Sequence, residues 1–175
     1  MKAQIIDWNL KESYGVRKYF KRRNVDGQEQ IHFSNPKRGY VEHIQFRNFP
    51  QLHIAENQVI QCVFEDCGEI YITSDFGPGF CRFRNIKALH CTSKFLKCCE
   101  FENIQCSGTA LVEIHKCRMS ECAFKNISLQ DETLLVYGHG FLCVSGYKLD
   151  GVTTERKDGK LFYGNERSWR PFVIE

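Results

Sequence analysis

The chain has 175 residues, 42% of them hydrophobic, which is enough for one domain with a sizeable core. Its formal net charge is only +3, and its basic residues are mostly interleaved with acidic ones, so a broad nucleic-acid-binding surface is not expected. No stretch approaches the roughly 18 consecutive apolar residues of a membrane-spanning helix, and no membrane partner is expected.

The beginning of the chain and its ten cysteines bear on where the protein is found. Asp7 interrupts what would be the apolar part of a signal peptide, so the sequence predicts a cytoplasmic protein. Cysteines stay reduced in that compartment, and we expect thiols buried in a core rather than a disulfide framework. No Cys-x-x-Cys pair occurs, and the sequence predicts neither a metal site nor a cofactor. Cys106, in a loop with Ser, Gly and Thr, is the predicted exposed thiol.

Residues 1–40 do not follow the repeat of the later chain and are predicted to form an N-terminal cap. Residues 30–36 echo the repeat, and they are predicted to form either a tight first coil or one arm of a hairpin with residues 41–46. Before them lies a basic segment, predicted to be a short surface helix or an edge strand. We interpret its basic side chains as a solvent-exposed face, and the alternative is that they contact phosphate or an acidic partner. The candidate contact residues are Arg17, Lys18, Lys21, Arg22 and Arg23.

Residues 41–152 contain six copies of one short sequence motif, whose commonest form is Cys-x-Phe-x-Asn-Ile. Successive copies start 18 to 25 residues apart, and a period of roughly twenty residues is the signature of a solenoid. Apolar and polar residues alternate within each copy, which is typical of a strand with one buried face. The sequence therefore predicts an all-β solenoid of about five to six coils with a capping element at each end.

Stacking of the coils about 4.8 Å apart would align equivalent positions into columns. The first inward column would hold Ile44, Cys62, Cys81, Cys99, Cys122 and Tyr147. The second would hold Phe46, Phe64, Phe83, Phe101, Phe124 and Leu149. A turn would follow at Asn48, Asp66, Asn85, Asn103 and Asn126, because Asn and Asp tolerate the left-handed backbone region. The chain would then re-enter the core at Phe49, Cys67, Ile86, Ile104, Ile127 and Val152.

The residue before each turn supports the same stacking, because its charge alternates in sign from copy to copy. Opposite charges on neighbouring strands attract each other, whereas like charges repel. This outward column would hold Arg47, Glu65, Arg84, Glu102, Lys125 and Asp150.

The other strand of each coil carries the main candidate site. Its flanking apolar residues, such as Leu52 and Ile54, are predicted to face inward and its central residue outward. Imidazole, phenol and carboxylate groups one coil apart suit acid-base chemistry, metal binding, or contact with a sugar or peptide. Such groups are also ordinary cross-strand neighbours. The candidates are His53, Tyr71, His90 and Glu113, with His115 beside them.

Residues 153–175 lie beyond the repeat and are predicted to form a C-terminal cap that covers the edges of the last coil. The dipeptide Asp158-Gly159 predicts a hairpin within this cap.

The inward columns, the Asn turns and the re-entering strand resemble the right-handed parallel β-helix of the pectate-lyase-like superfamily, over residues 40–152. This resemblance implies a single-stranded right-handed parallel β-helix, an architecture that lyases, hydrolases and many non-enzymes share. The lyases gather calcium-binding aspartates with an Arg or Lys base, and the hydrolases cluster aspartates on neighbouring coils. The aspartates of this chain, at positions 7, 26, 66, 75, 131, 150 and 158, are not spaced to form either group. The catalytic signature therefore does not carry over.

The first functional hypothesis is a non-catalytic binding module that docks on a protein partner, as an adaptor, an inhibitor or an effector. The alternative is a carbohydrate-binding or carbohydrate-active protein that uses the face of His53, Tyr71 and His90. Nucleic-acid binding by the basic segment is a third and disfavoured hypothesis, which would require an affinity that falls steeply with salt.

Overall fold

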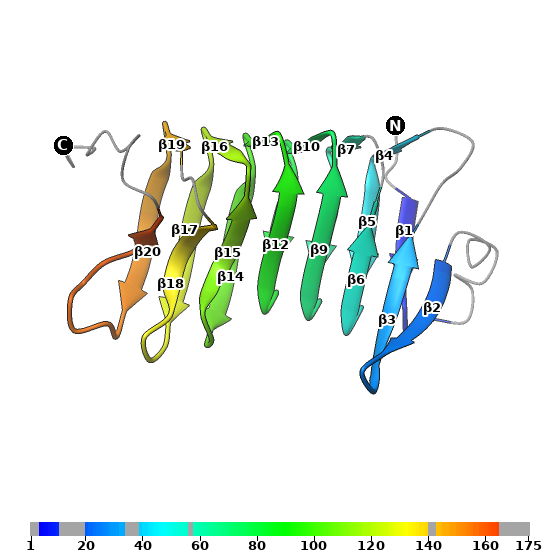
Figure 1. The fold of residues 1–175 in the computed structure, drawn as a ribbon, viewed down its shortest axis with the longest axis horizontal. Helices are drawn as coiled ribbons and strands as arrows, with labels where there is room; N and C mark the ends of the chain where they lie inside the picture. The colour runs from blue at the N-terminus through cyan, green and yellow to red at the C-terminus, as the bar shows by residue number, and fades with distance from the viewer. Residues whose placement is uncertain (1–3, 11–19, 34–38, 56–57, 140–142, 165–175) are drawn as a thin grey trace.

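A computed structural model describes residues 4–10, 20–33, 39–55, 58–139 and 143–164. These residues form strands, turns and loops, with no helix among them. The fold is all-β, and its strands make three sheets that run side by side along the long axis of the molecule (Figure 1). Among the described residues, every pairing between strands is parallel except one antiparallel pair near the N-terminus.

The first sheet has seven strands and contains the copies of the repeated sequence motif. In spatial order it consists of β1 (Gln4–Asp7), β5 (Ile44–Arg47), β8 (Val63–Glu65), β11 (Arg82–Arg84), β14 (Glu100–Cys106), β17 (Ala123–Leu129) and β20 (Lys148–Thr154). The second sheet has eight strands and carries the main candidate site. It consists of β2 (Phe20–Val25), β3 (Gln28–Phe33), β6 (Gln51–Ile54), β9 (Glu69–Ser74), β12 (Ala88–Ser93), β15 (Ala110–His115), β18 (Leu134–His139) and β21 (Phe162–Tyr163).

The third sheet has six shorter strands. It consists of β4 (Tyr40–Glu42), β7 (Gln58–Ile60), β10 (Phe76–Gly79), β13 (Phe95–Lys97), β16 (Arg118–Ser120) and β19 (Cys143–Ser145). From β4 to β20 the chain visits the six-, seven- and eight-stranded sheets in that fixed order, returning each time next to the strand it left. This connectivity is compatible with a β-helical solenoid.

The predicted inward columns form the core. The rings of Phe46, Phe64, Phe83, Phe101 and Phe124 are buried and stack with centroids 4.8 to 5.2 Å apart. Beside them lie the buried thiols Cys62, Cys81, Cys99 and Cys122. The stack forms because the strands pair residue for residue, which places each ring over its equivalent in the next coil.

The sixth copy departs from the prediction. Leu149 was expected to face the core as a buried residue, but it is 36% exposed. Tyr147 and Val152 are only partly buried. These residues are exposed because β20 is the last strand of the seven-stranded sheet in the described part of the chain. It pairs with β17 on one side, and no described strand pairs with it on the other.

The cysteines form a thiol-rich core, but the predicted exposed thiol is wrong. Cys106 is buried, because β14 continues through it and its Sγ donates a hydrogen bond to the Lys87 carbonyl at 3.1 Å. Burial raises the pKa of Cys106 to about 11, which keeps it protonated at neutral pH. Cys98 is instead the partly exposed thiol of the described chain, and its Sγ lies 3.1 Å from Glu121 Oε2.

The predicted turn residues all adopt the left-handed backbone conformation, with φ between 46° and 59° at Asn48, Asp66, Asn85, Asn103 and Asn126. Their side chains bond along the stack, for example from Asn126 Nδ2 to Asn103 Oδ1 at 2.8 Å. A second row of left-handed residues was not predicted, at His43, Gln61, Phe80, Cys98 and Glu121. Their residue types give no signal for this conformation, and the need to turn from the six- to the seven-stranded sheet imposes it.

The alternating outward charges are in register, as predicted. Glu65 lies opposite Arg47 and Arg84, and Glu102 lies opposite Arg84 and Lys125. Arg47 pairs with Glu65 at 2.8 Å and Arg84 with Glu102 at 2.9 Å.

The Glu65→Lys substitution should lower the free energy of unfolding by less than about 1 kcal/mol, because it places a positive charge between two others in a solvent-screened setting. Urea denaturation of this variant and of Glu65→Gln would measure the difference between repulsion and simple loss of the ion pair. That difference should shrink in 1 M salt, where the Debye length is about 3 Å. Stabilisation by Glu65→Lys would contradict the register.

The two ends of the fold correct two predictions. Residues 30–33 are one arm of a hairpin, but the other arm is β2 rather than residues 41–46, and β3 also pairs in parallel with β6. The hairpin expected at Asp158-Gly159 is wrong, because β20 and β21 join different sheets. Arg156 makes a two-pronged contact with Asp158 in the connecting loop, with both nitrogen-oxygen distances below 3 Å.

The basic segment is only partly described. Lys21, Arg22 and Arg23 lie on the edge strand β2, whose described side chains are mostly exposed, whereas Arg17 and Lys18 lie outside the described residues. The Arg22 guanidinium sits 4.8 Å from the centre of the Trp8 ring. The described part of the segment is therefore an edge strand, one of the two forms expected, rather than a surface helix.

Candidate functional site

The candidate site lies on the outer face of the eight-stranded sheet. Leu52 and Ile54 point into the core, so the residue between them, His53, must point outward, and the same alternation holds in the next coils. Strand pairing brings these outward positions into one row across the sheet. We call it the ring row, and it consists of His32, His53, Tyr71, His90, Glu113, Tyr137 and Tyr163.

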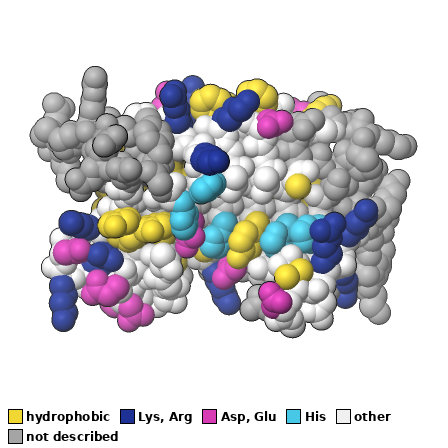
Figure 2. Space-filling view, in the orientation of Figure 1, with side chains coloured by type: hydrophobic (Ala, Val, Ile, Leu, Met, Phe, Trp, Pro, Cys, Tyr) yellow, Lys and Arg dark blue, Asp and Glu magenta, His cyan; other side chains and the backbone are white. Residues whose placement is uncertain are grey.

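The structure brings the predicted residues together and extends their set. His53, Tyr71, His90 and Glu113 are neighbours, and His115 lies beside the row, opposite Thr92 and His139. Figure 2 shows histidine and hydrophobic side chains in a band across this face. The sequence did not reveal that His32, Tyr137 and Tyr163 belong to the row, because the coils that carry them differ in length from the others.

The rings of the row are stacked face to face. The centroids of His32 and His53 are 4.4 Å apart, those of His53 and Tyr71 are 4.4 Å apart, and those of Tyr71 and His90 are 4.3 Å apart. The angles between their planes are 15°, 1° and 7°. The ring faces that meet within this stack therefore cover one another.

Hydrogen bonds hold the edges of these rings. The Tyr71 hydroxyl donates to Glu69 Oε2 at 2.6 Å, and His32 Nε2 lies 3.1 Å from Gln30 Oε1. At the other end Glu113 Oε2 lies 3.4 Å from His90 Nδ1 and 3.2 Å from His139 Nε2. The Nε2 atoms of His53 and His90 are buried and have no hydrogen-bond partner among the described residues.

The centre of the row is uncharged at neutral pH. Burial, together with repulsion from His32 and His90, lowers the pKa of His53 to about 4. Burial and the positive charge of Arg23 also lower the pKa of His32. Burial and the hydrogen bond to Glu69 raise the pKa of Tyr71 to about 12. At neutral pH the middle of the stack therefore presents a neutral imidazole, on His53, and a neutral phenol, on Tyr71.

This arrangement limits the chemistry that the row can perform. A general base works best with a pKa near the working pH, and His53 lies well below neutrality. A sugar ring packs against an aromatic face, but the faces of the central rings cover one another. Within the described ranges, no three His, Cys, Asp or Glu side chains are placed to hold a metal ion.

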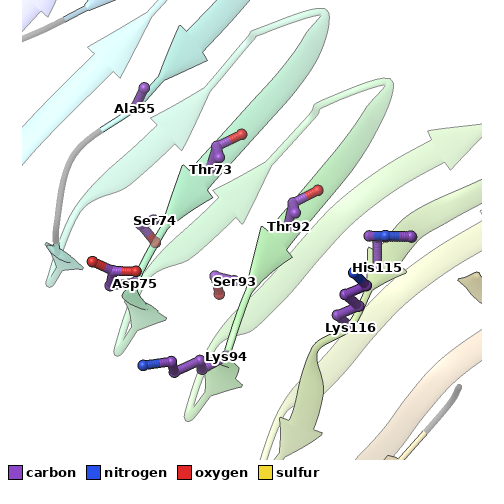
Figure 3. A pocket seen from close by; sticks show the side chains of 9 residues that line it. All are labelled: Ala55, Thr73, Ser74, Asp75, Thr92, Ser93, Lys94, His115 and Lys116. Carbon is purple, nitrogen blue, oxygen red and sulfur yellow. The ribbon is translucent and has the colours of Figure 1, made fainter.

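A groove borders the ring row where the eight-stranded sheet turns toward the six-stranded one. It has a volume of about 380 Å³ (Figure 3). The sequence signal for it is a Thr-Ser pair that recurs in register, at Thr73-Ser74 and Thr92-Ser93. The groove is lined by Ala55, Thr73, Ser74, Asp75, Thr92, Ser93, Lys94, His115 and Lys116.

A second and larger hollow, of about 590 Å³, follows the turn residues on the opposite edge of the eight-stranded sheet. It is lined by Trp8, Pro50 and the turn residues Asn48, Asp66 and Asn85, among others. The amides of Asn48 and Asn85 already donate to Asp7 and Asp66. These polar groups therefore stabilise the stack of turns and offer little to a ligand.

Comparisons with known proteins give no family for this chain. No protein-family model, no curated protein and no solved structure matches it. No helix in the described part of the chain is long and apolar enough to span a membrane.

Proposed function

We propose that the protein is a non-catalytic binding module that docks on a protein partner through the ring row. We further propose that its three sheets are the faces of one right-handed parallel β-helix, with the pectate-lyase-like architecture that the sequence resembles. The fixed order in which the chain visits the sheets supports this fold. The observation that carries the function is the stack of His53 on Tyr71, both neutral at pH 7, on the outer face of the eight-stranded sheet.

Protein interfaces commonly have an aromatic, uncharged core and a polar rim. The ring row has this composition. His53 and Tyr71 are neutral at pH 7, whereas Arg23, near His32, and Glu113, beside His90, are ionisable. A partner that covers these two rings would therefore desolvate no full charge on the rings themselves, and the charged groups around them, Glu69 included, would orient it.

The rigidity of the row also favours binding. Rings held between neighbours 4.3 to 4.4 Å away have already lost most of their rotational freedom. Binding then costs less side-chain entropy than it would with flexible surface groups. The Tyr71 hydroxyl donates to Glu69 but can still accept a hydrogen bond from a partner, and the parallel sheet beneath keeps it in a fixed position.

A saccharide remains the second candidate ligand, but the covered ring faces disfavour it. Those faces would have to separate before a sugar could pack on them. We therefore place protein binding first.

Photo-cross-linking tests the proposed function. A benzoyl-phenylalanine at position 71 should capture a defined protein in cells that make this protein naturally, whereas the same group at position 40 should not. Tyr40 is the matched control, because it is a partly exposed tyrosine on the six-stranded sheet. The His53→Ala/His90→Ala double variant should lower the yield from position 71 several-fold, because those rings flank the cross-linker.

Two outcomes would contradict the proposal. Equal capture from positions 71 and 40 would show that contact is not specific to the ring row. Absence of a captured protein, together with saccharide binding that the double variant abolishes on a glycan array, would establish the carbohydrate hypothesis instead.

A further inference from the structure

We infer that the groove beside the ring row binds an acidic side chain of the partner, so that the protein recognises an extended segment carrying Asp or Glu. This inference rests on the proposed function, because it names the chemistry of the partner that would cover the same face. The hydroxyls, the charges and the position of the groove support it.

The hydroxyl groups of the groove fall into two sets. Ser74 Oγ donates to the Gly77 carbonyl at 3.0 Å, and Ser93 Oγ donates to the Phe95 carbonyl at 2.8 Å and also contacts the Gly77 carbonyl. These serines therefore hold the turn into the six-stranded sheet. Thr73 and Thr92 are exposed and in register, and their side chains point out of the sheet in Figure 3. Their hydroxyls are the ones available to a ligand.

The charged groups of the groove favour an anion. Two ammonium groups, on Lys94 and Lys116, and the imidazole of His115 line it, against the single carboxylate of Asp75. Neither lysine forms an ion pair with another described residue, whereas Lys94 Nζ lies 5.1 Å from the centre of the Phe76 ring. Figure 3 shows the Lys116 side chain extending toward His115, and His115 pairs with Thr92 across the sheet. A carboxylate at that point would meet an ammonium, an imidazole and a hydroxyl.

The groove is continuous with the ring row. Tyr71 and Thr73 lie two residues apart on the same face of β9, and His90 and Thr92 have the same relation on β12. Two residues of a strand span roughly 6.6 Å. A partner chain that crosses the row parallel to the strands therefore places the side chain two residues further on over the groove, which is why the ligand is expected to be part of the same protein.

The test uses NMR titration of the uniformly ¹⁵N-labelled full chain with N-acetylated triglutamate amide. The peptide should shift the backbone amide signals of Thr92, His115 and Lys116, and triglutamine amide at the same concentration should not. The Lys94→Gln/Lys116→Gln variant should raise the dissociation constant for the peptide about tenfold or more, the size expected for loss of a charge-assisted hydrogen bond. Lys157→Gln, an exposed lysine in the loop before β21, is the matched control and should bind as the unmodified chain does.

Several results would overturn the inference. Equal binding of triglutamine, unchanged affinity in the double lysine variant, or tighter binding of inorganic phosphate or a sulfated disaccharide would each do so. The spectrum of each variant without peptide shows whether it is folded. Specific cross-linking from position 71 without triglutamate binding would refute this inference alone, whereas triglutamate binding without specific cross-linking would refute the proposed function.

Discussion

The Phe101→Ala substitution is expected to lower the free energy of unfolding by about 3–5 kcal/mol, the range for truncation of a fully buried phenylalanine. Phe101 has no exposed surface, and its ring lies between those of Phe83 and Phe124, at centroid distances of 4.8 and 4.9 Å. Truncation would leave a gap in the middle of this stack. The gap cannot close, because the strands on both sides are held in register by backbone hydrogen bonds.

Urea denaturation followed by circular dichroism would measure this effect. Phe83→Ala should give a loss of the same size, because Phe83 occupies the same column. Phe95→Ala is the control, since Phe95 is 40% exposed on the six-stranded sheet and should cost far less. A value for Phe101→Ala close to that for Phe95→Ala would show that the inward column is not packed as described.

The stability of the protein should fall as the pH is lowered from 6.5 toward 4, and His53 is the main cause. The pKa of His53 is lowered to about 4 by burial and by repulsion from His32 and His90, whereas the nearby Glu69 acts in the opposite direction. The unfolded chain therefore binds a proton near pH 6.5 that the folded chain does not accept until about pH 4. The contribution of neutral His53 is complete above pH 6.5 and is lost through this window, because protonation favours unfolding there.

The size of the pH effect is moderate. The lowered pKa of His53 corresponds to a decrease in the free energy of unfolding on the order of 1–2 kcal/mol, once the screening by solvent around this partly exposed ring is taken into account. The pKa of His32 is lowered in the same direction, so the two neighbouring rings should act together. Tyr71 stacks between His53 and His90 but stays neutral throughout, because its pKa is raised to about 12.

Unfolding free energies measured at several pH values between 4 and 7 would test this prediction. His53→Phe keeps a ring in the stack and removes its titration, so the slope in this window should become smaller than in the unmodified protein. His43→Gln is the matched control, because His43 lies in a turn outside the row, and Gln61 has the same left-handed conformation in the next coil. A slope that His53→Phe leaves unchanged would show that the row does not control the acid sensitivity.

Much of the fold could be predicted from periodicity alone. The phenylalanine column, the Asn and Asp turns and the alternating charges all appear in the structure where the repeat places them. Each depends on neighbours a nearly constant number of residues away, so a regular spacing in the sequence becomes a regular spacing in space. The same regularity predicts one outward row for His53, Tyr71, His90 and Glu113, and the strands pair in that way.

Where the spacing of the repeat is irregular, only the tertiary structure shows which strands and side chains become neighbours. Longer steps between the later copies hid the pairing of Glu113 with Tyr137 and its contact with His139, because loops of unequal length conceal which strands become neighbours. The path of the chain after β20 was mistaken for a hairpin, since a turn signal specifies a bend but not the sheet that the next strand joins. The Thr and Lys groove exists only where two sheets meet. In this chain the sequence alone determined the repeated strands and turns, whereas the packing of the sheets against one another determined which side chains share a site.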